Sequence, residues 1–199
     1  MPNSPSDVNT HDESDLALLS EEDQQAIAEI PLNDANSEAL AAVAIDVKKL
    51  EKRQRQITAT ITLPHAREQV WQVLTDYEGL SDFIPNLVSS QLLEHPEGGI
   101  RLEQVGVQSA LFLKFSARVV LDMTEDFLNS IHFEMAEGDF NAFSGDWCLA
   151  AVPEGTQLTY HLLIWPKRKM PVIAIERRLR YDLPRNLLAI QKRLEALPA

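Results

Sequence analysis

Residues 57–85 of this 199-residue chain read ITATITLPHAREQVWQVLTDYEGLSDFIP, and this stretch decides the fold. Apolar residues fall on every second position from Ile57 to Leu63, which predicts a half-buried strand. Proline fixes φ and lacks an N–H, so Pro64 favours the opening of a helix and Pro85 the end of one. Between the two prolines, an apolar stripe at helical spacing consists of Val70, Trp71, Val73, Leu74 and Tyr77. The stretch therefore predicts one strand followed by two short helices.

Downstream of Pro85 the chain alternates in short runs separated by turn residues. The predicted strands are Leu87–Leu93, Ile100–Val107, Leu111–Met123, Ser130–Glu137, Phe140–Val152 and Gln157–Trp165. Breakers such as the run from His95 to Gly99 and the run from Pro153 to Gly155 lie between them. Because no helical segment separates these strands, we expect an antiparallel meander. Alternation at Val43, Ile45 and Val47 predicts a further edge strand.

The last part of the chain has helical spacing. From Pro171 onward, the apolar positions are Ile173, Ile175, Leu179, Leu183, Leu187, Ile190, Leu194 and Leu197. The expected fold class is α+β: a curved antiparallel sheet wrapped around a long C-terminal helix, with two short helices after the first strand. This arrangement is the helix-grip architecture.

The segment VWQVLTDYE at residues 70–78, with Phe83-Ile84-Pro85 behind it, resembles the polyketide cyclase/dehydrase and START-like superfamily. Within that superfamily, the likeness is to the ubiquinone-binding START-domain branch and to bacterial relatives of the cyclase/dehydrase type. The resemblance covers roughly Val47 to Leu197. It implies the helix-grip fold, but the superfamily includes lipid carriers, quinone binders, cyclases, co-chaperones and translation inhibitors, so the fold does not decide the function.

Composition indicates one domain and a tail. Residues 1–42 are acidic and poor in core-forming residues, which predicts a flexible tail, and residues 43–199 form the START-like helix-grip domain. No apolar stretch approaches the ~20 residues that cross a bilayer, and the N-terminus lacks an apolar signal-peptide core. Cys148 is the one cysteine, so no internal disulfide can form. We therefore expect a cytoplasmic protein, with peripheral contact at a membrane as an option.

Charge is unevenly distributed along the chain. Residues 1–50 hold 11 acidic residues against two basic ones, whereas residues 161–199 hold nine basic residues against three acidic ones. The net charge of −12 repels a polyanion, so no nucleic-acid partner is expected. The bases Arg177, Arg178 and Arg180 are interpreted either as the solvated face of the last helix or as a docking surface for anionic lipid or an acidic partner.

The segment between the last strand and the long helix combines an aromatic residue with cations. Trp165, Lys167, Arg168 and Lys169 suit a membrane interface, where the ring lies at headgroup depth and the cations meet phosphates. The alternative is an ordinary polar connection with Trp165 anchored in the core.

The inner face of the sheet is expected to line a cavity for an apolar ligand. Small residues at Ala117 and Gly145, beside large aromatic ones, would leave room there, and methionines would adapt to a flexible ligand. The predicted ligand-binding residues are Leu113, Phe115, Ala117, Val119, Leu121, Met123, Phe133, Met135, Phe143, Gly145, Trp147, Tyr160, Leu162, Ile175, Leu179 and Leu183. A plain packed core is the alternative.

Catalytic signatures are weak. The sequence contains no phosphate-binding glycine loop, zinc spacing or nucleophile elbow, and its histidines are scattered, so no metal, cofactor or catalytic residue is predicted. The candidate acid–base groups for a cyclase would be Arg101, His132, Glu134, Asp146 and Tyr160, but alternation places most of the charged ones outward.

Three functions remain open on the sequence. The leading prediction is a non-catalytic binding or carrier protein for a quinone, isoprenoid or lipid in an internal cavity. The alternatives are a cyclase or dehydratase acting on an aromatic or polyketide-like substrate, and a protein-interaction module that uses the domain surface. A carrier predicts an apolar cavity without fixed charges, an enzyme predicts an inward acid or base, and a module predicts a filled core with an exposed patch.

Overall fold

The computed structural model describes Glu21, Gln25, residues 40–110, 113–168, Met170 and residues 172–197, without the side chains of Lys52, 108–110 and 113–115. Most of the predicted tail, residues 1–42, lies outside this part of the chain, and so does Lys169. The division into tail and domain therefore remains a prediction.

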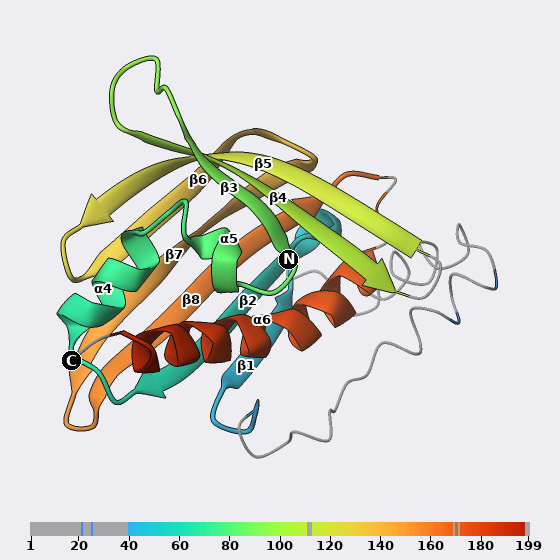
Figure 1. Cartoon of the computed structure of the whole chain (residues 1–199). Helices are drawn as coiled ribbons and strands as arrows, with labels where there is room; N and C mark the ends of the chain where they lie inside the picture. The colour runs from blue at the N-terminus through green and yellow to red at the C-terminus, as the bar shows by residue number, and fades with distance from the viewer. Residues whose placement is uncertain are drawn as a thin grey trace, which may run out of the picture.

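Within the described ranges the chain forms one antiparallel sheet of eight strands and a long C-terminal helix (Figure 1). The strands are β1 (Ala44–Lys49), β2 (Arg55–Leu63), β3 (Leu87–Leu93), β4 (Ile100–Ala110), β5 (Leu113–Asp126), β6 (Ser130–Gly138), β7 (Phe140–Val152) and β8 (Gly155–Pro166). The helices are the 3-10 turn η1 (Glu51–Arg53), α4 (Arg67–Thr75), α5 (Leu80–Phe83) and α6 (Val172–Glu195).

The strand order is β1-β2-β8-β7-β6-β5-β4-β3. The predicted meander runs from β3 to β8, and the β1–β2 hairpin adds to it through the pairing of β2 with β8. The α+β helix-grip prediction is confirmed. Several strand ends were misplaced, in β4, β5, β6 and β8. The strand predicted at Leu111–Met123 runs from Leu113 to Asp126, because charged Glu125 and Asp126 still pair with β6 opposite Ile131 and Ser130.

The sheet is curved, and its concave face turns toward α6 (Figure 1). Register shifts occur in three ladders: between Leu87 and Ser89, between Val120 and Leu121, and between Phe140 and Ala142. An extra residue in one strand bends it and increases the local twist, so these irregularities contribute to the curvature.

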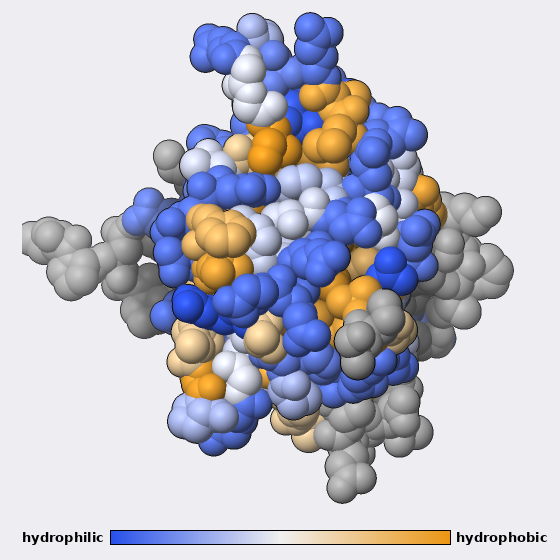
Figure 2. All heavy atoms as spheres, turned by 60° about the vertical axis from the view of Figure 1, so that its left-hand side comes forward, coloured by the Kyte–Doolittle hydropathy of each residue, from blue (hydrophilic) through white to orange (hydrophobic). Residues whose placement is uncertain are grey.

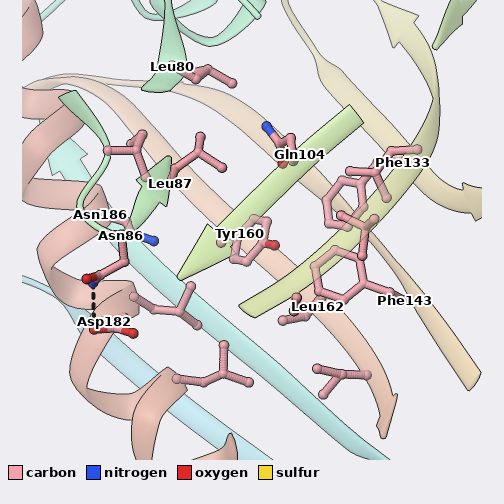
Figure 3. A pocket seen from close by; sticks show the side chains of 18 of the residues that line it. Leu80, Asn86, Leu87, Gln104, Phe133, Phe143, Tyr160, Leu162, Asp182 and Asn186 are labelled. Atoms are coloured by element: carbon pink, nitrogen blue, oxygen red, sulfur yellow. Dashed lines mark hydrogen bonds between the residues drawn. The ribbon is translucent and has the colours of Figure 1, made fainter. Parts of the chain in front are cut away.

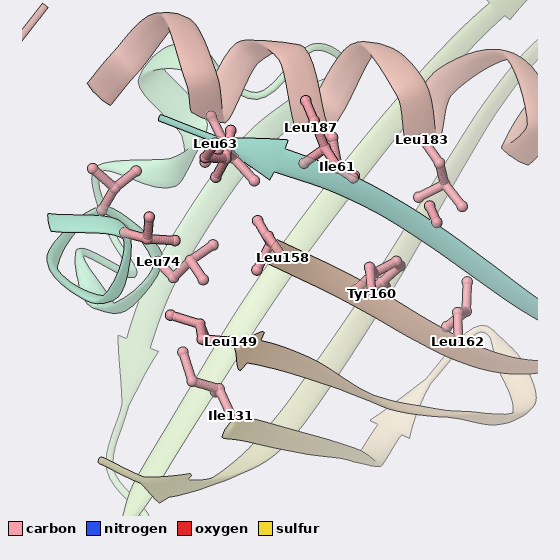
Figure 4. Packing of buried hydrophobic residues seen from close by; sticks show 14 of the residues in the cluster. Ile61, Leu63, Leu74, Ile131, Leu149, Leu158, Tyr160, Leu162, Leu183 and Leu187 are labelled. Atoms are coloured by element: carbon pink, nitrogen blue, oxygen red, sulfur yellow. The ribbon is translucent and has the colours of Figure 1, made fainter. Parts of the chain in front are cut away.

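On one side the helix packs directly on the sheet. α6 contacts β1 and β2 as well as α4 and α5. The side chains at alternate positions of β2 are at most 1% exposed, and Leu158 and Leu187, in the same apolar cluster, are fully buried. Figure 4 shows Leu187 of α6 next to Ile61 of β2, with Leu183 further along the helix. This solid apolar contact fixes the position of the helix.

A buried ion pair joins the same two elements. Arg55 of β2 has a side chain that is 1% exposed, and its Nε donates to a carboxylate oxygen of Glu176 in α6 at 2.7 Å. A charge at this depth needs its partner, because desolvating it alone is costly. The pair therefore links α6 directly to β2.

Large apolar side chains also remain on the outside. Val88, Leu92 and Leu93 of the edge strand β3 are exposed, as is Phe127 in the β5–β6 turn. Figure 2 shows one face of the molecule, on which hydrophobic side chains lie in separate areas among hydrophilic ones.

Candidate functional site

A cavity of about 350 Å³ lies between the concave face of the sheet and α6. Strands β4 to β8 form its wall, α6 covers it, and α4, α5 and residues 84–87 close one end. Its volume falls within the ~300–1,000 Å³ that small-molecule sites occupy. Figure 3 shows its lining.

Twelve of the sixteen predicted ligand-binding residues line this cavity. They are Ala117, Val119, Leu121, Met123, Phe133, Phe143, Trp147, Tyr160, Leu162, Ile175, Leu179 and Leu183. Alternation placed the nine strand residues among them on the inner face, because the period of two continues through each strand, and helical spacing placed Ile175, Leu179 and Leu183 of α6. That they bind a ligand remains a prediction. Leu113 and Phe115 lie in β5, but their side chains are outside the described part of the structure.

Gly145 and Met135 were predicted in the lining and do not contribute to it. A Cβ added at Gly145 would lie 1.9 Å from the carbonyl oxygen of His161 and 2.7 Å from the Phe133 ring. The space beside Gly145 is thus filled by a neighbouring strand and an aromatic ring. Met135 pairs with Leu121 at a register shift and packs against the core cluster instead.

Aromatic rings in mutual contact form one wall of the cavity. The Tyr160 ring lies 5.7 Å from the Phe133 ring and 4.2 Å from the Trp147 ring, and Phe143 lies 5.7 Å from Phe133, as centroid distances. Burial raises the pKa of the Tyr160 hydroxyl well above its usual range, because desolvation disfavours the phenolate. Tyr160 is therefore a neutral group on this wall.

Polar residues that the sequence interpretation did not assign to the cavity lie on α6. Arg178, Asp182 and Asn186 follow at intervals of four, between Ala174 and Ile190, and all five line the cavity. Residues four apart in a helix share a face. Arg178 is only partly solvated, because it lines the cavity and its Nε donates to Asp182 Oδ2 at 2.8 Å, and docking of anionic lipid or an acidic partner at these bases remains a prediction.

Asp182 is buried, with 5% of its surface exposed. Besides the bond from Arg178, it accepts a long bond of 3.4 Å from Asn86 Nδ2 (Figure 3). Asn86 has a φ of 64°, in the left-handed region that asparagine tolerates better than most residues. The turn after Pro85 thus carries an amide toward the helix, and the spacing of α6 was the sequence signal that could have indicated this cluster.

A second polar contact closes the end near α4. The Tyr77 hydroxyl donates to Glu125 Oε1 at 2.6 Å, and Ser90 donates to the Tyr77 carbonyl at 2.6 Å. Burial, and then the bond to Glu125, raise the pKa of Tyr77 above its usual range. Tyr77 lines the cavity with its hydroxyl already engaged.

The charged acid–base candidates lie away from the cavity. Arg101 donates two bonds to Asp122, at 2.6 and 2.8 Å, and this contact holds the pKa of the Asp122 carboxyl below its usual range. His132 Nδ1 lies 2.8 Å from Asp146 Oδ1 in an exposed pair. Neither these residues nor Glu134 line the cavity. Of the five candidates, Tyr160 alone does.

The segment proposed to contact a membrane is tied to the sheet. The ammonium group of Lys167 donates to the Gly138 carbonyl at 2.9 Å, and Arg53 donates to the carbonyls of Lys167 and Met170. Arg168 is exposed and Trp165 is half-buried. No helix in the described part of the chain is long and apolar enough to cross a bilayer, and no three His, Cys, Asp or Glu side chains gather there as a metal site requires.

A curved antiparallel sheet that holds a long C-terminal helix over a cavity places this chain among the helix-grip proteins. The model of the polyketide cyclase / dehydrase and lipid transport family matches residues 63–190, and the chain belongs to that family. The START-like resemblance of the sequence is thereby confirmed at the level of the family.

Individual relatives are distant. The chain is 24% identical over 108 residues to the ribosome association toxin RatA of Escherichia coli K12, a match that covers 54% of this chain and 66% of that protein, just under two thirds of its length.

Two solved structures show the same fold. A STAR-related lipid transfer protein from Xanthomonas axonopodis has a TM-score of 0.61 at 16% identity, covering 82% of this chain and 96% of that one. The Zhui aromatase/cyclase from Streptomyces sp. R1128 has a TM-score of 0.54 at 19% identity, covering 71% of this chain and 91% of that one.

Proposed function

We propose that this protein is a non-catalytic binding or carrier protein for an apolar small molecule of the quinone, isoprenoid or lipid class. The observation that supports the proposal is the cavity of about 350 Å³ with a mostly apolar, aromatic-rich lining. Such a lining favours an apolar ligand, because each Å² of apolar ligand surface that is removed from water contributes about 25 cal/mol to the free energy of binding.

The cavity does contain fixed charges, contrary to what the sequence criterion expected of a carrier, but their pairing favours binding over catalysis. General acid–base chemistry needs a positioned group that can exchange a proton with the substrate. The charged groups of the cavity, Arg178 and Asp182, are bonded to each other, and the Tyr77 hydroxyl is bonded to Glu125. These groups serve the lining as paired polar contacts.

The test is saturable binding of an uncharged fluorescent probe, N-phenyl-1-naphthylamine, to the purified full chain, with displacement by long-chain lipids. Ala117 lines the cavity, so Ala117→Leu should reduce the volume and weaken probe binding about tenfold or more while the protein stays folded. Ala150→Leu is the matched control, because Ala150 is exposed on β7 and outside the lining. Equal probe affinity in both variants, or no saturable binding at all, contradicts the proposal.

A cyclase or dehydratase is the second candidate, and the inward carboxylate of Asp182 is the observation in its favour. The solved aromatase/cyclase with the same fold is a further reason to test it. A ligand extracted from the purified protein and added back should be recovered chemically unchanged if the protein is a carrier. A product that forms with wild type but not with Asp182→Asn would favour the enzyme.

Surface interaction is the remaining alternative, with exposed Val88 and Leu92 on β3 as its candidate patch.

Peripheral contact with anionic membranes through Trp165, Lys167, Arg168 and Lys169 is part of the carrier proposal, since a carrier must reach its source of ligand.

A further inference from the structure

The cavity is not uniformly apolar: Gln104 of β4 and Ser116 of β5 are among its lining residues, and a cluster of polar groups lies on α6. The residues of α6 that line the cavity run from Ala174 to Ile190, and the polar ones among them are Arg178, Asp182 and Asn186, with Leu179 and Leu183 beside them. Figure 3 shows Asp182, Asn186 and Asn86 together beside the helix, while Phe133 and Phe143 lie at the other side of the cavity. A guest that fills this space meets polar groups at one end and rings at the other.

Asn186 presents an unsatisfied atom. Its side-chain oxygen is buried and has no hydrogen-bond partner among the residues that the structure describes. A buried acceptor without a partner costs about 1–3 kcal/mol, and such groups in native proteins usually meet a ligand or a water. Because Asn186 lines the cavity, a guest in the cavity can supply the missing donor.

The neighbours of Asn186 restrict the charge of that guest. Asp182 precedes it by one helical turn, is 5% exposed and already accepts bonds from Arg178 and Asn86. The Arg178–Asp182 pair is neutral overall, so an anionic head group would lose its hydration in this buried site without gaining an unpaired positive charge, which is costly. A cationic head group would compete with the bonded Arg178 for the same oxygens. The cluster therefore favours an uncharged group.

A hydroxyl fits the site best among uncharged groups. It donates to the amide oxygen, and it also accepts from an N–H, so it suits either orientation of the Asn186 amide. A carbonyl or an ether accepts only and leaves the oxygen unsatisfied.

We propose that the ligand is an amphipathic molecule that ends in an uncharged hydroxyl, which donates to the Asn186 side-chain oxygen while its apolar body lies against the aromatic wall. This inference rests on the proposed function, because it names the chemical class of the cavity's guest. Long-chain alcohols, isoprenoid alcohols and reduced quinones belong to this class; fully apolar hydrocarbons and fatty-acid anions do not.

The experiment compares three ligands of similar length by displacement of N-phenyl-1-naphthylamine from the full chain. Decan-1-ol carries the hydroxyl, 1-methoxydecane replaces its donor with a methyl ether, and undecane has no polar atom. Wild type should bind the alcohol about three- to tenfold more tightly than the ether, as one buried hydrogen bond implies. Asn186→Leu, of similar size, should abolish this preference while binding undecane at least as well.

Asn129→Leu is the matched control, because Asn129 is exposed in the β5–β6 turn and outside the cavity lining. It should keep the preference for the alcohol. Equal affinity of wild type for alcohol and ether overturns the inference and leaves the carrier proposal standing, provided undecane displaces the probe. A preference that survives in Asn186→Leu also overturns it. Absence of probe binding and of displacement by all three compounds overturns both proposals. The wild-type comparison alone decides the case if Asn186→Leu fails to fold.

Discussion

Strands β2 and β5 have the same alternating pattern in the sequence and different surroundings in the structure. The inward residues of β2, from Ile57 to Leu63, are at most 1% exposed and none lines the cavity. The inward residues of β5, from Ala117 to Met123, all line it. Alternation thus decides which face a side chain occupies, and the distance to the next layer decides whether that face becomes core or cavity.

The difference arises from how α6 is held. The helix contacts β1 and β2 and is bonded to β2 through Arg55 and Glu176. β5 lies four places from β2 in the sheet, beyond β8, β7 and β6, and the sheet curves between them. A helix that packs on one side of a curved sheet leaves a gap over the other side.

The largest expected effect separates the two sides along α6 itself. Leu187 is fully buried against β2, so Leu187→Ala should lower the free energy of unfolding by about 2–5 kcal/mol. Leu179 is partly buried and lines the cavity, so Leu179→Ala enlarges an existing space and should cost clearly less. Urea denaturation of both variants measures the difference. Equal losses would contradict the division into a packed and an open side.

A smaller effect distinguishes Gly145 from Ala117, which the sequence had treated alike. A Cβ at Gly145 clashes with the His161 backbone and with Phe133, so Gly145→Ala should cost about 1–3 kcal/mol of stability. In Ala117→Leu the larger side chain extends into the cavity. The unfolding midpoint should stay within a few degrees of that of wild type, while the affinity for the apolar probe should fall. Thermal unfolding and probe titration measure both effects. If Gly145→Ala left stability unchanged while Ala117→Leu destabilised the protein without weakening probe binding, the open space would not lie beside Ala117.

Alkaline pH tests how well the aromatic wall excludes water. Burial raises the pKa of Tyr160, so the folded state favours the protonated hydroxyl, whereas an unfolded tyrosine ionises near pH 10. The contribution of the protonated Tyr160 hydroxyl to the free energy of unfolding is complete below about pH 10. It is lost as the pH rises above that value, by at most about 1.4 kcal/mol per pH unit. Tyr160→Phe should lose less stability than wild type between pH 9.5 and 11. Identical pH profiles would mean that water reaches the Tyr160 hydroxyl in the folded protein.

The smallest expected effect concerns the segment between β8 and α6. Each cation near an anionic bilayer contributes about 1 kcal/mol, and Lys167 is partly engaged by the Gly138 carbonyl. Replacing Lys167, Arg168 and Lys169 together with alanine should reduce co-sedimentation with anionic vesicles at low salt and leave neutral vesicles unaffected. A variant that sediments like wild type with both vesicle types would leave this segment as an ordinary connection.

Local patterns in the sequence predicted the fold well. The proline-bounded helices, the alternating strands and the long last helix each depend on periodicity within one segment, and β3 and β7 were placed with their observed ends. The inner face of the cavity followed from the same periodicity.

The sequence could not show what depends on distances between segments. Gly145 suggested open space, but the ring that fills it comes from Phe133 on the neighbouring strand. Arg178 suggested a solvated base, but its partner Asp182 lies one turn along the helix on the face that α6 turns to the cavity. Helical spacing alone places Arg178, Asp182 and Asn186 on one face of α6. The direction in which that face points depends on how the helix is packed against β2, which the sequence does not show.

Native mass spectrometry of the full chain, purified without detergent, tests the central claim most directly. The account predicts a population that carries one small apolar molecule per chain, which organic solvent releases and which Ala117→Leu carries in smaller amount than Ala150→Leu. A chain that carries nothing, and that takes up neither decan-1-ol nor undecane when these are added, would contradict the claim that the space beneath α6 is a ligand site.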